Sequence, residues 1–155
     1  MSMKKSIFEN GKTKVNAKTF IEFQNNIEEA ISLVDQKIEG EGWQDLTLTS
    51  DFHAYRDISS KAPKYRKTGK LVEIIGEIAP TSNISAGENK IITTLPEGFR
   101  PSVDRYFICQ GSGRAIWTLY VYTDGRVIFS RYGKSEYTEA PTSVWLPFSV
   151  MFLVD

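Results

Sequence analysis

The sequence predicts a mainly β protein in which one amphipathic helix near the N-terminus precedes an antiparallel β-sandwich or barrel. Between Phe20 and Ile38, apolar side chains recur every three or four residues, which is the period of a helix. After Gly42 they alternate with polar side chains, which is the period of a strand with one buried face. From there on, short apolar segments are separated by Gly, Pro, Asn and Asp, and no second helical pattern occurs.

The pattern divides the chain into a basic N-terminal segment at residues 1–16, a helix at 17–39 and a β body at 43–155. Asn16 is a suitable N-cap for the helix, and Gly40 provides a C-terminal stop. The apolar stripe of the helix is wider than the seam of a two-stranded coiled coil. Two interpretations are therefore open: the helix packs on its own domain, or it forms a short bundle between identical chains.

Alternation, turn residues and apolar runs predict the strands of the body. Thr68-Gly69-Lys70 predicts a tight turn, and Gly76 predicts a kink or bulge in the strand that follows. Asp124-Gly125 is the strongest hairpin signal in the chain, because it suits the positive backbone angles of a tight turn. We expect strands at residues 43–49, 65–67, 71–78, 90–94, 105–110, 115–122, 126–132 and 143–154.

Composition excludes several classes of protein. The 155 residues suffice for one domain with a small appendage. Nineteen basic and nineteen acidic side chains cancel, which argues against duplex DNA or an anionic membrane as the partner. The apolar run near the C-terminus contains Pro147 and is shorter than the roughly 20 residues of a membrane span. We expect a soluble protein made in the cytoplasm, since residues 1–14 lack the apolar centre of a secretory signal.

One cysteine and one histidine limit the chemistry of the chain. Cys109 has no partner for an internal disulfide and is expected to be a small buried apolar residue. His53 alone cannot build a His-rich zinc site, and no G-x-S-x-G motif accompanies it. No spacing selects a pair of carboxylates, and we expect Glu73 and Glu77 on the solvent face of a strand. We therefore expect no metal, no cofactor and no catalytic residue.

The basic cluster at residues 61–70 admits two interpretations. With Tyr55 and Tyr65 nearby, it mixes charge and aromatic rings as a surface for single-stranded nucleic acid does. A barrel that binds oligonucleotides would carry a marked basic excess, which this body lacks. We therefore interpret the cluster as a solvated loop and strand edge, and we expect no nucleic-acid partner.

The β body is rich in aromatic residues, and alternation separates them into two faces. Trp117 lies on the face that is typical of a core, whereas Tyr120 and Tyr122 are expected to point outward. Arg131 and Tyr132, across the predicted hairpin, are expected beside them. Exposed rings with polar tips suit sugar recognition, and they suit a subunit interface equally well. The candidate saccharide-binding residues are His53, Tyr55, Arg56, Tyr120, Tyr122 and Arg131.

The order of these parts resembles the receptor-binding and baseplate (tail-tip) proteins of long-tailed phages of Gram-positive bacteria. Several short phrases, spread over most of the chain, carry this resemblance. They are FENGKTKVNA at 8–17, which runs into the helix, Gly42-Trp43, Tyr65-Arg66-Lys67-x-Gly69 before 71–76, LPEGFRP at 95–101, Thr123-Asp124-Gly125, and a terminal strand that ends near Phe152.

The resemblance implies a fold, an assembly and a role. Residues 43–155 would form a jelly-roll-like β-sandwich head, residues 17–39 a short trimeric coiled-coil stem, and residues 1–16 a shoulder that docks to other baseplate or tail proteins. The protein would be a homotrimer in the virion, at the tail tip or baseplate, assembled in the host cytoplasm. It would bind host cell-wall polysaccharide or teichoic acid without cleaving it.

Two alternatives stay open. A glycan-depolymerising enzyme would place carboxylates in clefts between subunits. A purely structural baseplate subunit would turn its aromatic surface toward another protein. The sugar-contacting residues of the family vary from phage to phage, so none is carried over onto this sequence.

Overall fold

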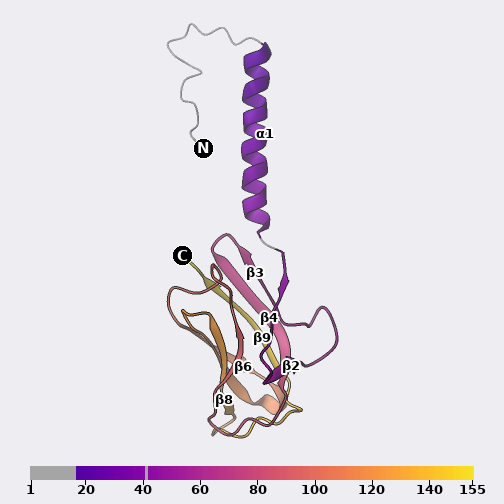
Figure 1. Ribbon diagram of the computed structural model, residues 1–155, viewed down its shortest axis with the longest axis vertical. Coiled ribbons are helices and arrows are strands. Elements are labelled where there is room, and N and C mark those ends of the chain that lie inside the picture. The colour runs from indigo at the N-terminus through magenta and orange to yellow at the C-terminus, as the bar shows by residue number, and fades with distance from the viewer. Residues whose placement is uncertain (1–16, 41) are drawn as a thin grey trace. The chain divides into compact units, whose positions relative to one another are not determined.

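The computed structural model describes residues 17–40 and 42–155, and it confirms a mainly β protein with one N-terminal helix (Figure 1). One compact unit contains helix α1 (Ala17–Glu39), and the other runs from Gly40 to Asp155. We call the second unit the head. The predicted segment 1–16, with the N-cap Asn16, lies outside the described residues.

Helix α1 leaves its apolar stripe uncovered in the single chain. Its 23 residues are followed by Gly40, whose φ of 69° is the left-handed conformation that commonly ends a helix. Within the described residues, no helix is long and apolar enough to cross a bilayer. The apolar stripe of α1 is exposed. Its exposed large side chains include Phe20, Phe23, Ile27, Ile31 and Val34.

The first sheet of the head is built around one long strand, β4. Ile78 of β4 pairs with Ala54 on one side and with Leu146 on the other, so β2 and β9 flank β4 on opposite edges. Strand β3 pairs with the first half of β4, and β1 extends the sheet beyond β3. All pairs are antiparallel, and the strands are β1 (Gln44–Asp45), β2 (Phe52–Ala54), β3 (Lys64–Thr68), β4 (Leu71–Pro80) and β9 (Leu146–Leu153).

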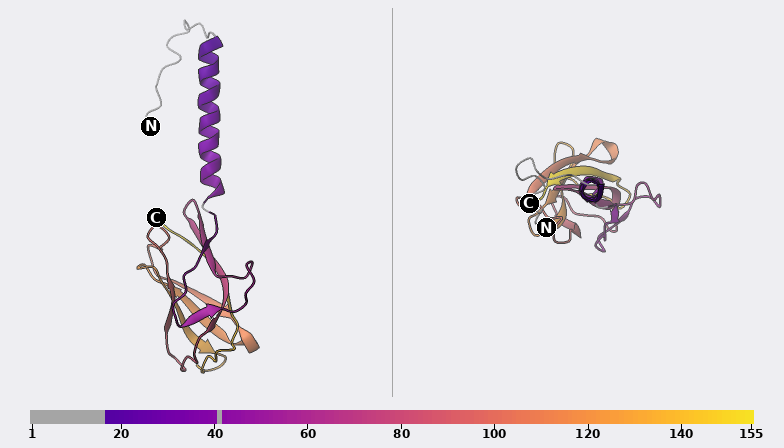
Figure 2. Two further views of the ribbon diagram at one scale, coloured as in Figure 1. Left: turned by 45° about the vertical axis from the view of Figure 1, so that its right-hand side comes forward. Right: turned by 90° about the horizontal axis from the view of Figure 1, so that it is seen from above.

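The second sheet has the order β5-β8-β7-β6 and is also antiparallel. The two views of Figure 2 show the head as two layers of strands. Strands β6 and β9 each lie at an open edge of their own sheet. The strands of this sheet are β5 (Lys90–Thr94), β6 (Arg105–Gln110), β7 (Ile116–Val121) and β8 (Arg126–Gly133).

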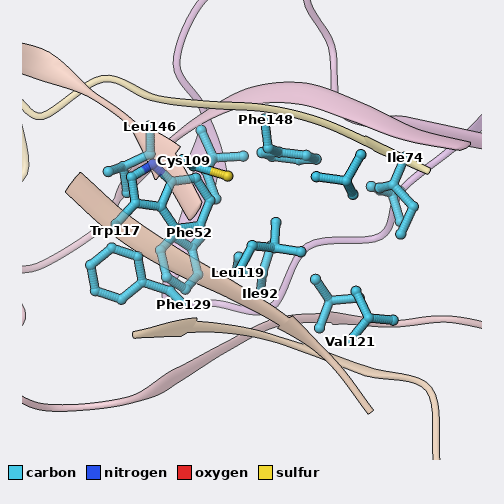
Figure 3. Packing of buried hydrophobic residues seen from close by; sticks show 14 of the residues in the cluster. Phe52, Ile74, Ile92, Cys109, Trp117, Leu119, Val121, Phe129, Leu146 and Phe148 are labelled. Atoms are coloured by element: carbon cyan, nitrogen blue, oxygen red, sulfur yellow. The ribbon is translucent and has the colours of Figure 1, made fainter. Parts of the chain in front are cut away.

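The core lies between the two sheets and is largely aromatic and aliphatic (Figure 3). Trp117 of β7 is fully buried, as predicted, and its ring centroid lies 5.6 Å from that of Phe129 and 6.3 Å from that of Phe148. The three residues come from β7, β8 and β9 and therefore join both sheets. Burial of these rings is a main source of stability for the sandwich.

Cys109 is buried, as predicted, and burial raises the pKa of its thiol from 9.0 to about 11. The unfolded thiol ionises near its ordinary pKa, whereas the folded thiol keeps its proton until the pH approaches the higher value. We therefore expect the thiol to contribute stability below pH 9, and this contribution to be lost as the pH rises from 9 to about 11. The check is urea denaturation of the wild type and of Cys109→Ala across this range. Parallel pH profiles of the two proteins would contradict the expectation.

The strands differ from the prediction at three places. The strand expected at 43–49 is reduced to β1, Gln44–Asp45, and β2 forms where the sequence predicts a loop. The ladder between β4 and β9 keeps its register through Gly76, so no bulge interrupts it there. Glycine is required at that position because a Cβ would lie 2.6 Å from the Cα of Pro63.

Candidate functional site

The predicted hairpin between β7 and β8 is confirmed. The Gly125 N–H donates to the Tyr122 carbonyl at 2.9 Å, and the Tyr122 N–H donates to the Arg126 carbonyl at 2.9 Å. Gly125 has a φ of 92°, and the Asp124 carboxylate accepts the Arg126 N–H at 3.0 Å. This arrangement is a three-residue hairpin loop that closes on a left-handed glycine.

Gly125 is also packed closely against the segment that contains Leu95 and Arg100. A Cβ at this position would lie 2.6 Å from the Leu95 carbonyl oxygen, which already accepts a hydrogen bond from Arg100. We expect Gly125→Ala to lower the free energy of unfolding by about 2 kcal/mol, because alanine is strained at this φ and its Cβ would clash with the Leu95 carbonyl oxygen.

Gly98→Ala is the matched control for the hairpin glycine. Gly98 has a φ of 85°, but its Cβ would meet no described residue within 4 Å apart from its two chain neighbours, so we expect only the conformational cost, about 1 kcal/mol. Urea denaturation of both variants measures the difference. Equal losses would show that the contact with Leu95 contributes nothing.

Three tyrosines form a row on the outer face of the second sheet, and we call Tyr106, Tyr120 and Tyr122 the tyrosine ladder. The Tyr106 and Tyr120 rings meet edge to face, with centroids 4.8 Å apart. The Tyr120 and Tyr122 rings are stacked, with centroids 6.0 Å apart. Tyr106 is directly opposite Tyr120 in the β6–β7 pairing and is 61% exposed. The ladder therefore presents aromatic surface to solvent.

Two arginines of β8 lie over the ladder. The Arg131 guanidinium is 5.9 Å from the centre of the Tyr120 ring, and that of Arg126 is 5.2 Å from the centre of the Tyr122 ring. Such cation–π contacts hold the guanidinium groups against the rings. The Arg126 backbone N–H and then its side chain donate hydrogen bonds to Asp124, which lowers the pKa of that carboxyl. The carboxylate in turn fixes Arg126, whose Nε lies 2.7 Å from Asp124 Oδ2.

A bulge in β8 sets the position of Arg131. The β7–β8 register shifts between the pairs Thr118–Ser130 and Ile116–Gly133, and Arg131 has a left-handed φ of 55°. The irregularity leaves Arg131 exposed and turns Tyr132 into the core, where its ring lies 6.2 Å from that of Phe129. The expectation that Tyr132 lies outward beside Arg131 was therefore wrong.

The outer face around the ladder is hollowed. One depression of about 280 Å³ is lined by ladder residues together with Asn89, Ile128, Ser130 and Arg131. An adjoining depression of about 400 Å³ shares Asn89, Tyr122 and Ile128 with it and extends to Arg126. We call the ladder, its two arginines and these depressions the ladder face. Aromatic rings beside amide, hydroxyl and guanidinium groups can contact the C–H face of a sugar and hydrogen-bond its hydroxyls.

Of the other three predicted residues, His53 lies on strand β2 of the first sheet, and Tyr55 and Arg56 follow directly after this strand. His53 of β2 pairs with Ala79, and the Tyr55 N–H donates to the Glu77 carbonyl at 2.9 Å. The Arg56 guanidinium lies 5.5 Å from the centre of the Tyr55 ring. The structure thus gathers Tyr120, Tyr122 and Arg131 on one sheet, and places His53, Tyr55 and Arg56 on or directly after strand β2 of the other. It adds to the ladder face three residues that the sequence did not single out: Tyr106, Arg126 and Asn89.

The charged residues of the first sheet are largely paired. Arg66 binds the Glu73 carboxylate at 2.7 Å, and Lys61 lies 3.3 Å from the Glu77 carboxylate. Lys64 and Lys67 donate to the carbonyls of Ser59 and Gly98, at 2.7 and 2.9 Å. Glu77 is only 7% exposed, so the expectation that it lies on a solvent face was wrong. The loop that carries Arg56 and Lys61 covers it.

Comparison with known proteins gives a fold. No protein-family model and no curated protein matches the sequence. The receptor-binding protein gp15 of Listeria phage PSA is similar in structure, with a TM-score of 0.62 and 15% identity over 96% of this chain and 89% of that chain. The chain has the fold of phage receptor-binding proteins. The head domain of the receptor-binding protein of lactococcal phage bIL170 is also similar, with a TM-score of 0.54 and 14% identity over 74% of this chain and 99% of that chain.

This shared fold confirms the resemblance that the sequence phrases predict. The bIL170 domain is matched over nearly its whole length, and gp15 over most of its length. At these identities the likeness establishes the fold of a receptor-binding head and leaves the ligand to be argued from the residues of this chain.

Proposed function

We propose that this protein is a receptor-binding protein of a phage tail that binds a cell-wall saccharide through the ladder face and does not cleave it. The observation that carries the proposal is the exposed tyrosine ladder with Arg126 and Arg131 over its rings. It lies on a head whose fold is that of phage receptor-binding proteins.

The chemistry of the ladder face suits a sugar. A stack of rings contacts the C–H face of a pyranose, while the guanidinium groups, Asn89 and Ser130 can hydrogen-bond hydroxyls or an attached phosphate. The depressions are small, at about 280 and 400 Å³, and we expect a single site of this size to bind weakly. Repetition of the site in an oligomer, and of the oligomer in a tail tip, converts weak sites into tight adhesion.

We propose a homotrimer for the intact protein, with α1 as its stem. A helix of 23 residues with an exposed apolar stripe is marginally stable alone, and association of three copies covers the stripe. The wide stripe fits a bundle of more than two helices. Residues 1–16 would then attach the trimer to other tail or baseplate proteins.

A structural role in the baseplate is the second candidate. Ile108 of β6 is 81% exposed and Ile116 of β7 is 45% exposed, both on the same sheet as the ladder. Large exposed aliphatic side chains favour a contact with protein over a contact with sugar. In that case the ladder face would be covered in the assembled tail.

Adsorption to cells tests the proposed function. Fluorescently labelled intact protein is mixed with a panel of Gram-positive strains, before and after extraction of their wall polysaccharide. We expect binding to at least one strain and loss of that binding after extraction. Binding that survives extraction would contradict a polysaccharide receptor, and binding to no strain would favour the structural role.

A further inference from the structure

A second hollow lies at the edge of the head, between strands β6 and β9. It has a volume of about 870 Å³, and we call it the edge groove. Tyr106–Gln110 line it from β6, Pro147–Val150 line it from β9, and Trp145 lines it from just before β9. Both strands are at open edges of their sheets, so the groove is the place where the sandwich is not closed by strand pairing. Its volume lies in the range of small-molecule sites.

A buried carboxylate lines this groove. Glu77 is 7% exposed, with Lys61 Nζ 3.3 Å from its Oε1 and Arg56 Nε 3.7 Å from its Oε2. The distance to Arg56 exceeds that of a hydrogen bond. Within residues 17–40 and 42–155, Glu77 Oε2 has no hydrogen-bond donor. A buried acceptor in this state is unfavourable and calls for an explanation.

A buried donor belongs to Trp145, another residue that lines the groove. Trp145 Nε1 is covered and lacks an acceptor within the part of the chain that the structure describes. The Trp145 backbone is fixed by Ser112, whose Oγ accepts the Trp145 N–H at 2.8 Å and whose N–H donates to the Trp145 carbonyl at 3.0 Å. Burial alternates from Val144 to Phe148, so Trp145 shares its face with Pro147, the residue that pairs with Glu77.

We propose that the edge groove is a second saccharide subsite, specific for a neutral sugar, in which hydroxyl groups donate to Glu77 and accept from Trp145. A hydroxyl group can donate one hydrogen bond and accept another, whereas a phosphodiester oxygen only accepts and therefore cannot donate to the Glu77 carboxylate. Phe148, Pro147 and the exposed Ile108 provide apolar walls for the C–H face of the ring. Lys61 and Arg56 are about half exposed, at 50% and 52%, so their side chains can move aside as the sugar enters.

Tyr106 connects the groove to the ladder face. It lines the edge groove and also packs edge to face on Tyr120. A polysaccharide can therefore extend from the ladder across Tyr106 into the groove. This inference rests on the proposed function and deepens it, because it assigns a neutral glycosyl unit to one end of the site.

The test uses the indole N–H signals of the labelled intact protein in NMR spectra. The chain has three tryptophans, and Trp145→Phe assigns the signal of Trp145 by removing it. The probes are wall oligosaccharide released from a strain that the protein adsorbs to, then glucose, galactose, rhamnose and N-acetylglucosamine, and dimethyl phosphate, a phosphodiester without hydroxyl groups. We expect the Trp145 signal to shift with the oligosaccharide and with at least one neutral sugar, and not with dimethyl phosphate.

Two variants make the test specific. Glu77→Gln keeps the shape of the side chain but removes its charge, and we expect about a tenfold loss of affinity for the oligosaccharide. Trp145→Phe keeps an aromatic ring but lacks the N–H donor, and we expect it to bind the oligosaccharide more weakly as well. Both spectra must retain the dispersion of the folded head, which separates lost binding from lost structure.

Three outcomes would overturn the subsite. If the oligosaccharide shifts other signals but leaves that of Trp145 in place, and both variants bind normally, the groove is no subsite and the ladder proposal stands. If dimethyl phosphate shifts Trp145 and no neutral sugar does, the assignment to a neutral sugar is wrong. If wall oligosaccharide binds nowhere on the protein, the proposed function fails together with the subsite.

Discussion

Replacing Ile27 and Ile31 of α1 by aspartate is expected to convert the proposed trimer into a monomer. Both side chains belong to the exposed apolar stripe of the helix. In a three-helix stem the double variant would bury six carboxylates in place of six aliphatic groups. The free-energy cost of burying these charges exceeds the free energy of association that a stem of 23 residues per chain can contribute. Light scattering of the intact protein gives the mass directly. Adsorption to cells should fall about a hundredfold with the loss of multivalency.

The matched control places the same charges on the opposite face of the helix. Asn25→Asp with Ser32→Asp adds two carboxylates outside the apolar stripe, and we expect this variant to remain trimeric. A trimer that survives the substitutions at Ile27 and Ile31 would show that the heads associate without the stem. A monomeric wild type would contradict the stem altogether.

Replacing Tyr122 by alanine is expected to weaken saccharide binding by about thirtyfold at each site, which corresponds to about 2 kcal/mol for a central aromatic contact. The Tyr122 ring stacks on Tyr120, supports Arg126 and lines both depressions of the ladder face. Removal of the ring therefore has two effects: the sugar loses an aromatic contact surface, and the Arg126 guanidinium loses its cation–π partner. In a trimer the loss repeats at every site, so adsorption to cells should fall further than binding to a single site.

Tyr137→Ala is the control for the ladder. Tyr137 is also exposed, at 55%, but contributes to neither depression of the ladder face. We expect it to bind as the wild type does, while Tyr122→Phe should retain most of the affinity because it keeps the ring. Equal binding by Tyr122→Ala and the wild type would remove the ladder face from the binding site.

Local patterns in the sequence were enough for most of the fold. The period of the apolar stripe predicts α1, and the alternation around Trp117 predicts which face of β7 is buried. The Asp124-Gly125 signal predicts the position of the hairpin, although the loop has three residues and only Gly125 adopts a positive φ. Strand β2 has three residues, too few for an alternating pattern to stand out.

The site depends on strand register, on a bulge and on a covering loop, which local sequence patterns do not predict. Tyr106 joins the ladder only because the β6–β7 register places it opposite Tyr120. The bulge at Arg131 reverses the faces of the residues after it, so simple alternation misplaces Tyr132. Glu77 has the pattern of a solvent-facing residue in an alternating strand, but the loop with Arg56 and Lys61 covers it.

Calorimetric titration of purified wall polysaccharide into the intact protein tests the central claim most directly. The polysaccharide comes from a strain to which the protein adsorbs, and the mass of the protein is determined on the same sample by light scattering. We predict a trimer that binds the polysaccharide, and a Tyr122→Ala trimer that binds it at least tenfold more weakly. A trimer that does not bind polysaccharide, or a Tyr122→Ala variant that binds it as the wild type does, would contradict saccharide recognition through the ladder face.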